Sequence, residues 1–150
     1  MSLSRTTIAA FFVLTASMTT AFAASSEIYT GRFSNVAVSG HDPVAYFEDG
    51  EPVKGKKEYS YEYNGAEWRF SSEEHLAMFK EDPEAYAPQY GGYCAWAVSQ
   101  GYTASGNPDN WTIYEGKLYL NYNSKVQSDW LKDIPGFIAK ANENWPAVLN

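Results

Sequence analysis

The sequence predicts a small α+β domain in which two antiparallel β-hairpins pack with several short helices. Large apolar residues alternate with polar ones over 59–70, around Asn64-Gly65, and again over 111–122, around Glu115-Gly116. Helix-start signals and helical spacing of apolar residues stand between and after these two segments. The chain has no internal repeat and no linker, so we expect residues 24–150 to form one domain.

Asn-Gly is the dipeptide best suited to a two-residue hairpin turn, because both positions need a positive φ. Counting outward from this turn places the large aromatic side chains on one face of the first hairpin and the charged ones on the other. One face is therefore core and the other is solvated. The expected pairs are Tyr63 with Ala66, Tyr61 with Trp68, and Tyr59 with Phe70.

The second hairpin follows the same pattern around Glu115-Gly116. Residues 101–110, which precede it, contain glycine and proline and are expected to form a loop. The buried pairs of the second hairpin are expected to be Trp111 with Leu120 and Ile113 with Leu118.

Helix signals lie on both sides of the second hairpin. Ser71 followed by Glu74 is a capping-box pattern, which predicts a helix that turns Leu76 and Phe79 inward. Four further helices are predicted: a short one from Asp82-Pro83 towards Tyr86, one over 93–98, one after Ser124 carrying Val126, Trp130 and Leu131, and one from Pro135 carrying Phe137, Ile138, Ala141 and Trp145.

The first 23 residues are typical of a secretory signal. Arg5 supplies the positive start, an apolar run over 8–14 follows, and Ala21-Phe22-Ala23 has the small residues that signal peptidase reads. We therefore expect cleavage before Ala24 and a periplasmic or secreted location. The apolar run is too short for a membrane span, which needs about 20 residues.

The chain is acidic, with 18 Asp and Glu against 11 Lys and Arg and a formal net charge of −7. Loss of Arg5 with the leader would make the remainder one unit more negative. Nucleic acids and anionic lipids both require clustered basic residues, so the composition argues against either as a partner. It gives no indication of a particular protein partner.

Residues from Val38 to about Tyr86 resemble the YHS domain, a small module found in copper-transporting ATPases and other metal-handling proteins. Asp42-Pro43-Val44 is similar to the opening triplet of that family. Tyr63-Asn64-Gly65, with Trp68 and Phe70, is similar to its hairpin, and Phe79 followed by Pro83-Glu84-Ala85-Tyr86 to its closing pattern. The remaining residues would form a C-terminal extension.

The resemblance implies metal binding, but the thiolates of metal-type members are replaced. Those members carry a Cys after the Asp-Pro-Val triplet and a Phe-Cys-Ser-x-x-Cys sequence after the hairpin. Here Ala45 follows the triplet, and the second sequence reads Phe70-Ser71-Ser72-Glu73-Glu74-His75. Of these positions, only His75 could still bind a metal.

Three residues could form a rebuilt metal site. Cys94 is the one cysteine, and His41 and His75 are the two histidines, a ligand set that suits Cu or Zn. No pair has a short ligand spacing, so the fold would have to bring the three together. The alternative is that Cys94 packs as a small hydrophobe, that His75 lies on the surface and that His41 belongs to a turn.

Aromatic side chains gather around Gly91-Gly92 and make up 17% of the whole chain. Tyr90, Tyr93 and Trp96 could line a pocket for a small organic ligand, with Tyr86 and Tyr102 nearby. The alternative is that they fill the core of a small β-rich domain.

The sequence favours binding over catalysis, because it contains no nucleophile elbow, phosphate loop or zinc-protease helix. Its first interpretation is a periplasmic accessory or binding protein of the YHS type that handles copper or another soft metal through Cys94 with His75 or His41. The second is a metal-free module that holds a small molecule or a protein in the aromatic cluster. The third is a redox protein with Cys94 as its single reactive thiol, although the chain has no C-x-x-C and no resolving cysteine.

Overall fold

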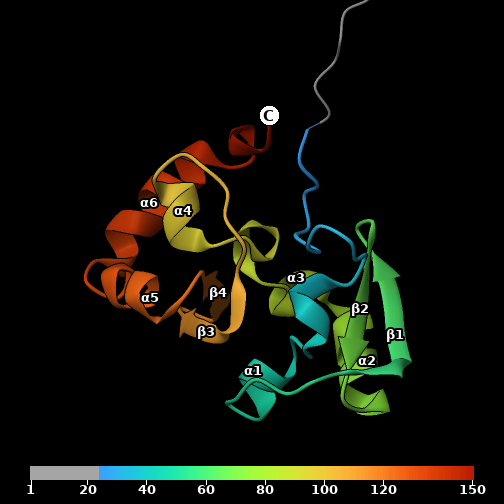
Figure 1. Ribbon diagram of the computed structural model, residues 1–150. Coiled ribbons are helices and arrows are strands. Elements are labelled where there is room, and N and C mark those ends of the chain that lie inside the picture. Colours follow the sequence, from blue (N-terminus) through green and yellow to red (C-terminus); the bar gives the residue numbers. More distant parts are fainter. Residues whose placement is uncertain (1–23) are drawn as a thin grey trace, which may run out of the picture.

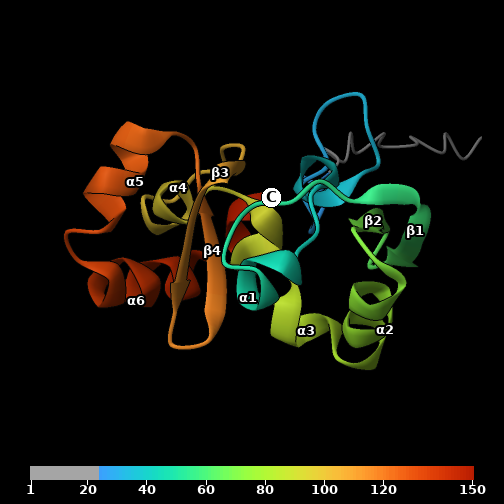
Figure 2. The same ribbon diagram turned by 90° about the horizontal axis from the view of Figure 1, so that it is seen from below.

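The computed structural model describes residues 24–150, so the predicted leader and its cleavage site lie outside the described residues. The α+β prediction is confirmed: helices accompany two antiparallel sheets of two strands each. Figures 1 and 2 show the two hairpins in different halves of the molecule, each with its own helices. The segment after Ala24 is hydrogen-bonded to the rest of the domain: the Ser25 amide donates to the Leu149 carbonyl (2.8 Å) and the Tyr29 amide to the Gly91 carbonyl (2.9 Å).

The first hairpin consists of β1 (Lys56–Tyr63) and β2 (Ala66–Phe70). The expected pairs Tyr63–Ala66 and Tyr61–Trp68 are present, and both turn residues, Asn64 and Gly65, have positive φ. The expected pair Tyr59–Phe70 is wrong. A register shift between Lys56 and Ser60 interrupts the alternation, and Phe70 pairs with Lys56 instead.

The second hairpin consists of β3 (Asn107–Tyr114) and β4 (Lys117–Asn121). The predicted pairs Trp111–Leu120 and Ile113–Leu118 are both present. β3 begins at Asn107, inside the segment predicted as a loop. The sequence pattern missed this part because the pairing register shifts between Asn107 and Trp111.

Short helices surround the first hairpin: η1 (Ala37–Gly40), α1 (Ala45–Glu48), α2 (Glu73–Glu81) and α3 (Pro83–Tyr86). The predicted cap of α2 is one residue too early. Ser72 caps the helix by accepting a hydrogen bond from the His75 amide (3.1 Å), because the Ser71 side chain bonds to Asp42 instead. Asp82 caps α3 through the Ala85 amide, as its position before Pro83 predicts.

The second hairpin lies against η2 (Gln89–Gly92), α4 (Ala95–Ser99), α5 (Ser124–Trp130), α6 (Ile134–Asn144) and η3 (Ala147–Leu149). α4 begins two residues later than predicted and ends at Ser99, since Tyr93 is extended and Cys94 is the non-helical residue before the first turn. Asn123 caps α5 and Asp133 caps α6, each through a backbone amide three residues on.

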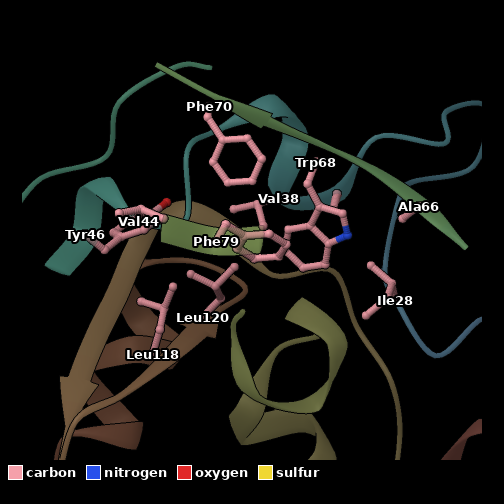
Figure 3. Close-up of a cluster of buried hydrophobic side chains, with 11 residues drawn as sticks. Ile28, Val38, Val44, Tyr46, Ala66, Trp68, Phe70, Phe79, Leu118 and Leu120 are labelled. Carbon is pink, nitrogen blue, oxygen red and sulfur yellow. The ribbon is translucent and has the colours of Figure 1, made fainter. Parts of the chain in front are cut away.

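β4 separates two hydrophobic cores. Its Leu118 and Leu120 point into the first core, where they meet Phe79 and Trp68 from the first half of the chain (Figure 3). Tyr119 points the opposite way, into the second core. Alternation along one strand therefore supplies side chains to both cores and joins the two halves. The second core also contains Tyr90, Tyr93, Ala95, Val98, Trp130 and Ala141.

Within residues 24–150, none of the helices combines the length and the apolar character that crossing a membrane requires.

Candidate functional site

Asp42 lies three residues before the first residue of α1, is fully buried, and accepts five hydrogen bonds through its carboxylate. Oδ1 accepts from the backbone amides of Val44 (2.9 Å) and Ala45 (3.2 Å). Oδ2 accepts from the amide (2.8 Å) and the hydroxyl (2.6 Å) of Ser71 and from Nδ1 of His75 (2.6 Å). One carboxylate thus ties together the start of α1, the end of β2 and the first turn of α2.

His75 is not the exposed surface residue that its sequence position suggested, because its side chain is only 12% exposed. An ionised carboxylate only accepts hydrogen bonds, so Nδ1 of the ring carries the proton that Asp42 accepts. Ser71 and Asp42 both lie on the Nδ1 side, with the Ser71 hydroxyl 3.4 Å from that nitrogen. In a serine-hydrolase triad the histidine bridges serine and aspartate through its two different nitrogens, so this arrangement is not a triad.

His41 lies in a turn, as its position before Asp42-Pro43 predicts. Its Nδ1 is 3.3 Å from the Val38 carbonyl, and its backbone forms an isolated bridge with Lys54. The ring is therefore held by the local backbone, and no hydrogen bond joins it to His75 among the described residues.

Cys94 precedes α4 and is fully buried. Its amide donates to the Ala104 carbonyl (2.9 Å), and its backbone forms a bridge with Leu120 of β4. Asn121 donates to its sulfur, with Nδ2 lying 3.8 Å from Sγ. At that distance the sulfur is a weak acceptor, so no strong polar contact holds the thiol.

The Cys94 cavity is a pocket of about 200 Å³ between α4, α5 and the loop before β3. Its walls carry aromatic rings, small apolar groups and one thiol, and no charged side chain lines it. Tyr102 and Tyr122 are about half exposed and form its rim, with Tyr102 edge-on to Trp96 at 6.4 Å. The lining residues are Cys94, Trp96, Ala97, Tyr102, Ala104, Tyr122 and Val126.

Asn121 borders Cys94 and has an unmet hydrogen-bonding group. The residue is fully buried, and its Oδ1 has no partner. Residues two apart on a strand share a face, so Asn121 points to the same side of β4 as Tyr119, towards the second core. A buried carbonyl oxygen without a hydrogen-bond partner lowers the free energy of unfolding by about 1–3 kcal/mol, so the Asn121 side chain is an unfavourable polar group beside the thiol.

The aromatic residues predicted to form one pocket are separated by the fold. Trp96 lines the Cys94 cavity, Tyr90 lines a larger cleft beside the first hairpin turn, and Tyr93 lines a groove along the N-terminal segment. Tyr90 and Tyr93 are also part of the second core, so the core-filling interpretation holds for them. Of the three, only Trp96 lines the cavity beside the thiol.

The comparison with protein families agrees with this architecture. Residues 44–90 match the family model of the YHS domain. The chain contains a YHS domain. Searches of curated proteins and of solved structures gave no significant match. The matched segment runs from the residue before α1 into η2, whereas Cys94 and its cavity lie beyond it.

Asp42 lies just before the matched segment, and its hydrogen-bond partners lie within it. Ala45, Ser71 and His75 are the positions at which the YHS resemblance implies thiolates in metal-type members, and here all three donate hydrogen bonds to Asp42. Ala45 has no donor atom in its side chain, and the Ser71 hydroxyl and His75 Nδ1 are already bonded to the carboxylate.

The residues of the YHS domain therefore do not fit a soft-metal site. Within residues 24–150, no three His, Cys, Asp or Glu side chains are grouped as metal ligands would be. Cys94 adjoins α4 and His75 lies in α2, and Figures 1 and 2 show these helices in different halves of the molecule. Metal binding through Cys94 with His75 or His41 remains a prediction that this arrangement does not favour.

Sequence reasoning missed several residues of both sites. Asp42 was recognised only as part of the opening triplet, although an Asp three residues before a helix start is a signal for a carboxylate that binds backbone amides. Asn121, Tyr122 and Val126 gave no signal, because they meet Cys94 or its cavity only through the packing of β4 and α5 against α4.

Proposed function

We propose that this YHS-domain protein is an exported, metal-free binding module, and that it holds a small uncharged apolar ligand in the Cys94 cavity. The observation that carries the proposal is the composition of that cavity, which is aromatic and apolar apart from one thiol and the hydroxyls of its two tyrosines. A ligand with a formal charge would be desolvated there without any compensating partner.

The size of the cavity limits the ligand to about one or two fused rings. An apolar cavity of about 150 Å³ in another protein stays dry and binds benzene. At about 200 Å³, the Cys94 cavity has room for benzene, toluene or indole. The rim rings of Tyr102 and Tyr122 and the wall ring of Trp96 can pack against a flat ligand.

The test is a titration of the mature protein with benzene and indole, followed by calorimetry and by the shift in unfolding temperature. Val126→Phe places a ring inside the cavity and is expected to abolish binding while the protein still folds. Leu131→Phe is the matched control, because Leu131 is exposed, lies at the end of the same helix and does not line the cavity. Equal binding to both variants would contradict the proposal.

Cys94→Ala separates this proposal from metal binding. The substitution enlarges an apolar cavity, so indole binding is expected to persist or strengthen. A metallo-site would instead show one Cu(I) or Zn(II) per chain in the wild type and none in the variant. The metal interpretation would be preferred if the wild type bound one metal ion per chain, Cys94→Ala bound none, and neither protein bound the apolar probes.

The arrangement does not support a redox role for Cys94. Attack by a thiolate requires access, and this side chain has no exposed surface. Iodoacetamide, a small neutral reagent, is expected to alkylate Cys94 slowly in the folded protein and more slowly with indole present. Fast alkylation that indole does not change would contradict both the burial of the thiol and the position of the ligand.

Export is supported by the sequence of residues 1–23, which has the charged start, the apolar run and the small residues of a secretory signal. The mass of the protein recovered from a periplasmic or culture-medium fraction would test cleavage before Ala24.

A further inference from the structure

A second cleft, separate from the Cys94 cavity, lies beside the turn of the first hairpin. It has a volume of about 380 Å³, within the usual range for small-molecule sites. Five parts of the chain meet there: the N-terminal segment, the β1–β2 turn, the α3–η2 region, the start of β4 and the residue after α6. The residues that matter for the argument are Glu27, Tyr63, Glu84, Tyr90, Lys117 and Trp145.

The cleft carries two carboxylates, those of Glu27 and Glu84. Neither Glu27 nor Glu84 takes part in a salt bridge or side-chain hydrogen bond among the described residues. Burial raises the pKa of the Tyr63 phenol first of all, and the charges of Glu84 and then Glu27 raise it further. The charges of both carboxylates therefore reach the Tyr63 phenol, which lines the same cleft. Lys117 is the single basic residue in the lining.

The same cleft has aromatic walls. Tyr90 and Trp145 are in contact, with ring centroids 5.9 Å apart, and Tyr63 lines the cleft beside the hairpin turn. The Tyr90 hydroxyl donates to Asn142 Oδ1 (2.8 Å), which fixes the ring. Aromatic faces attract cations through the ring quadrupole, and they favour weakly hydrated organic cations that gain from apolar contact as well.

The N-terminal segment reaches the cleft because of a glycine. Gly91 has φ +63°, and a Cβ at that position would overlap the carbonyl oxygen of Glu27. The absent side chain lets the backbone of Glu27 lie directly against η2, where the Tyr29 amide bonds to Gly91. This packing places the Glu27 carboxylate, which comes from the start of the chain, at the same cleft as Glu84.

We propose that this cleft binds a small organic ammonium ion, held by Glu27 and Glu84 and by the aromatic walls from Tyr63, Tyr90 and Trp145. A strongly hydrated metal ion suits the site less well, because the aromatic walls supply no ligand atoms other than phenols that stay protonated. An anion is excluded by the two carboxylates. The net charge of −7 over the whole chain also attracts a cation rather than an anion.

The experiment uses choline as the probe, with its neutral isostere, in which carbon replaces the quaternary nitrogen, as the control ligand. Isothermal titration of the mature protein at low ionic strength is expected to show choline binding, weakened by added salt, and little or no binding of the isostere. Equal affinity for the two, or no binding of choline in the millimolar range, would overturn the proposal.

Five variants separate the cleft from general surface charge and from the Cys94 cavity. Glu27→Gln and Glu84→Gln are each expected to weaken choline binding by about two- to fivefold, while Lys117→Gln strengthens it. Glu51→Gln removes an exposed carboxylate outside the cleft and is expected to leave the affinity unchanged. If Glu51→Gln has the same effect as the two cleft variants, the attraction is diffuse and the site is refuted. Val126→Phe, which fills the Cys94 cavity, is expected not to affect choline binding.

Discussion

Removal of the Asp42 carboxylate is the perturbation whose effect the structure defines best. Asp42→Ala leaves the amides of Val44, Ala45 and Ser71 without their acceptor and also releases His75. A hydrogen bond to a charged group contributes about 1.5–3 kcal/mol, and a buried donor left unpaired costs about 1–3 kcal/mol. Water that enters the vacated space would recover part of this loss. We therefore expect the free energy of unfolding to fall by about 3–5 kcal/mol, a large share of the total for a domain of this size.

Urea unfolding, followed by tryptophan fluorescence, measures this difference. His75→Ala removes only one of the partners of the carboxylate and is expected to cost about 1–2 kcal/mol. Asp49→Ala is the matched control, because Asp49 is exposed just after α1 and accepts no side-chain hydrogen bond among the described residues; its effect should stay within about 0.5 kcal/mol. A loss below about 1 kcal/mol for Asp42→Ala would refute the view that this carboxylate holds α1, β2 and α2 together.

Two further predictions concern the backbone of η2 and the ionisation of a buried phenol. Gly91→Ala should lower the free energy of unfolding by at least about 2 kcal/mol and expose the N-terminal segment to proteases, because the new Cβ overlaps the Glu27 carbonyl. Gly116→Ala is the control: its φ is +76° and open space surrounds it, so it should cost only about 1–2 kcal/mol. Equal losses for the two variants would contradict the overlap between the Cβ and Glu27. Burial, with the charges of Asp109 and Asp42, raises the pKa of Tyr46, so the folded state favours the neutral phenol and the unfolding free energy should fall as the pH rises above about 10. Tyr46→Phe should make this decline shallower in urea titrations at successive pH values, and an unchanged slope would argue against the shifted ionisation.

Much of the local structure could be predicted from short-range patterns. Asn64-Gly65 and Glu115-Gly116 adopt positive φ at both turn positions, and the pairs next to each turn have the expected register. Errors begin farther from the turns. The Tyr59–Phe70 pair is absent because a bulge shifts the register, and alternation in the sequence cannot reveal a bulge.

The cap of α2 shows how a distant contact overrides a local signal. Ser71 and Ser72 are equally suitable caps by residue type, and the pattern with Glu74 selected Ser71. In the folded chain the Ser71 hydroxyl donates to Asp42, nearly 30 residues earlier, so Ser72 takes the capping position. The same contact buries His75, which the sequence alone placed at the surface.

The sequence by itself determined the α+β class, the two hairpins, the order of helices α2 to α6 and the YHS resemblance, because each depends on residues close together in the chain. Only the tertiary structure decided that Ala45, Ser71 and His75 surround a carboxylate, that Cys94 borders a cavity, and that Glu27 and Glu84 share a cleft. The physical reason is that both cores form between segments far apart in sequence, on opposite faces of β4. The packing of these cores decides which polar groups are paired, which are unpaired and which face a cavity, and no local sequence pattern encodes that packing.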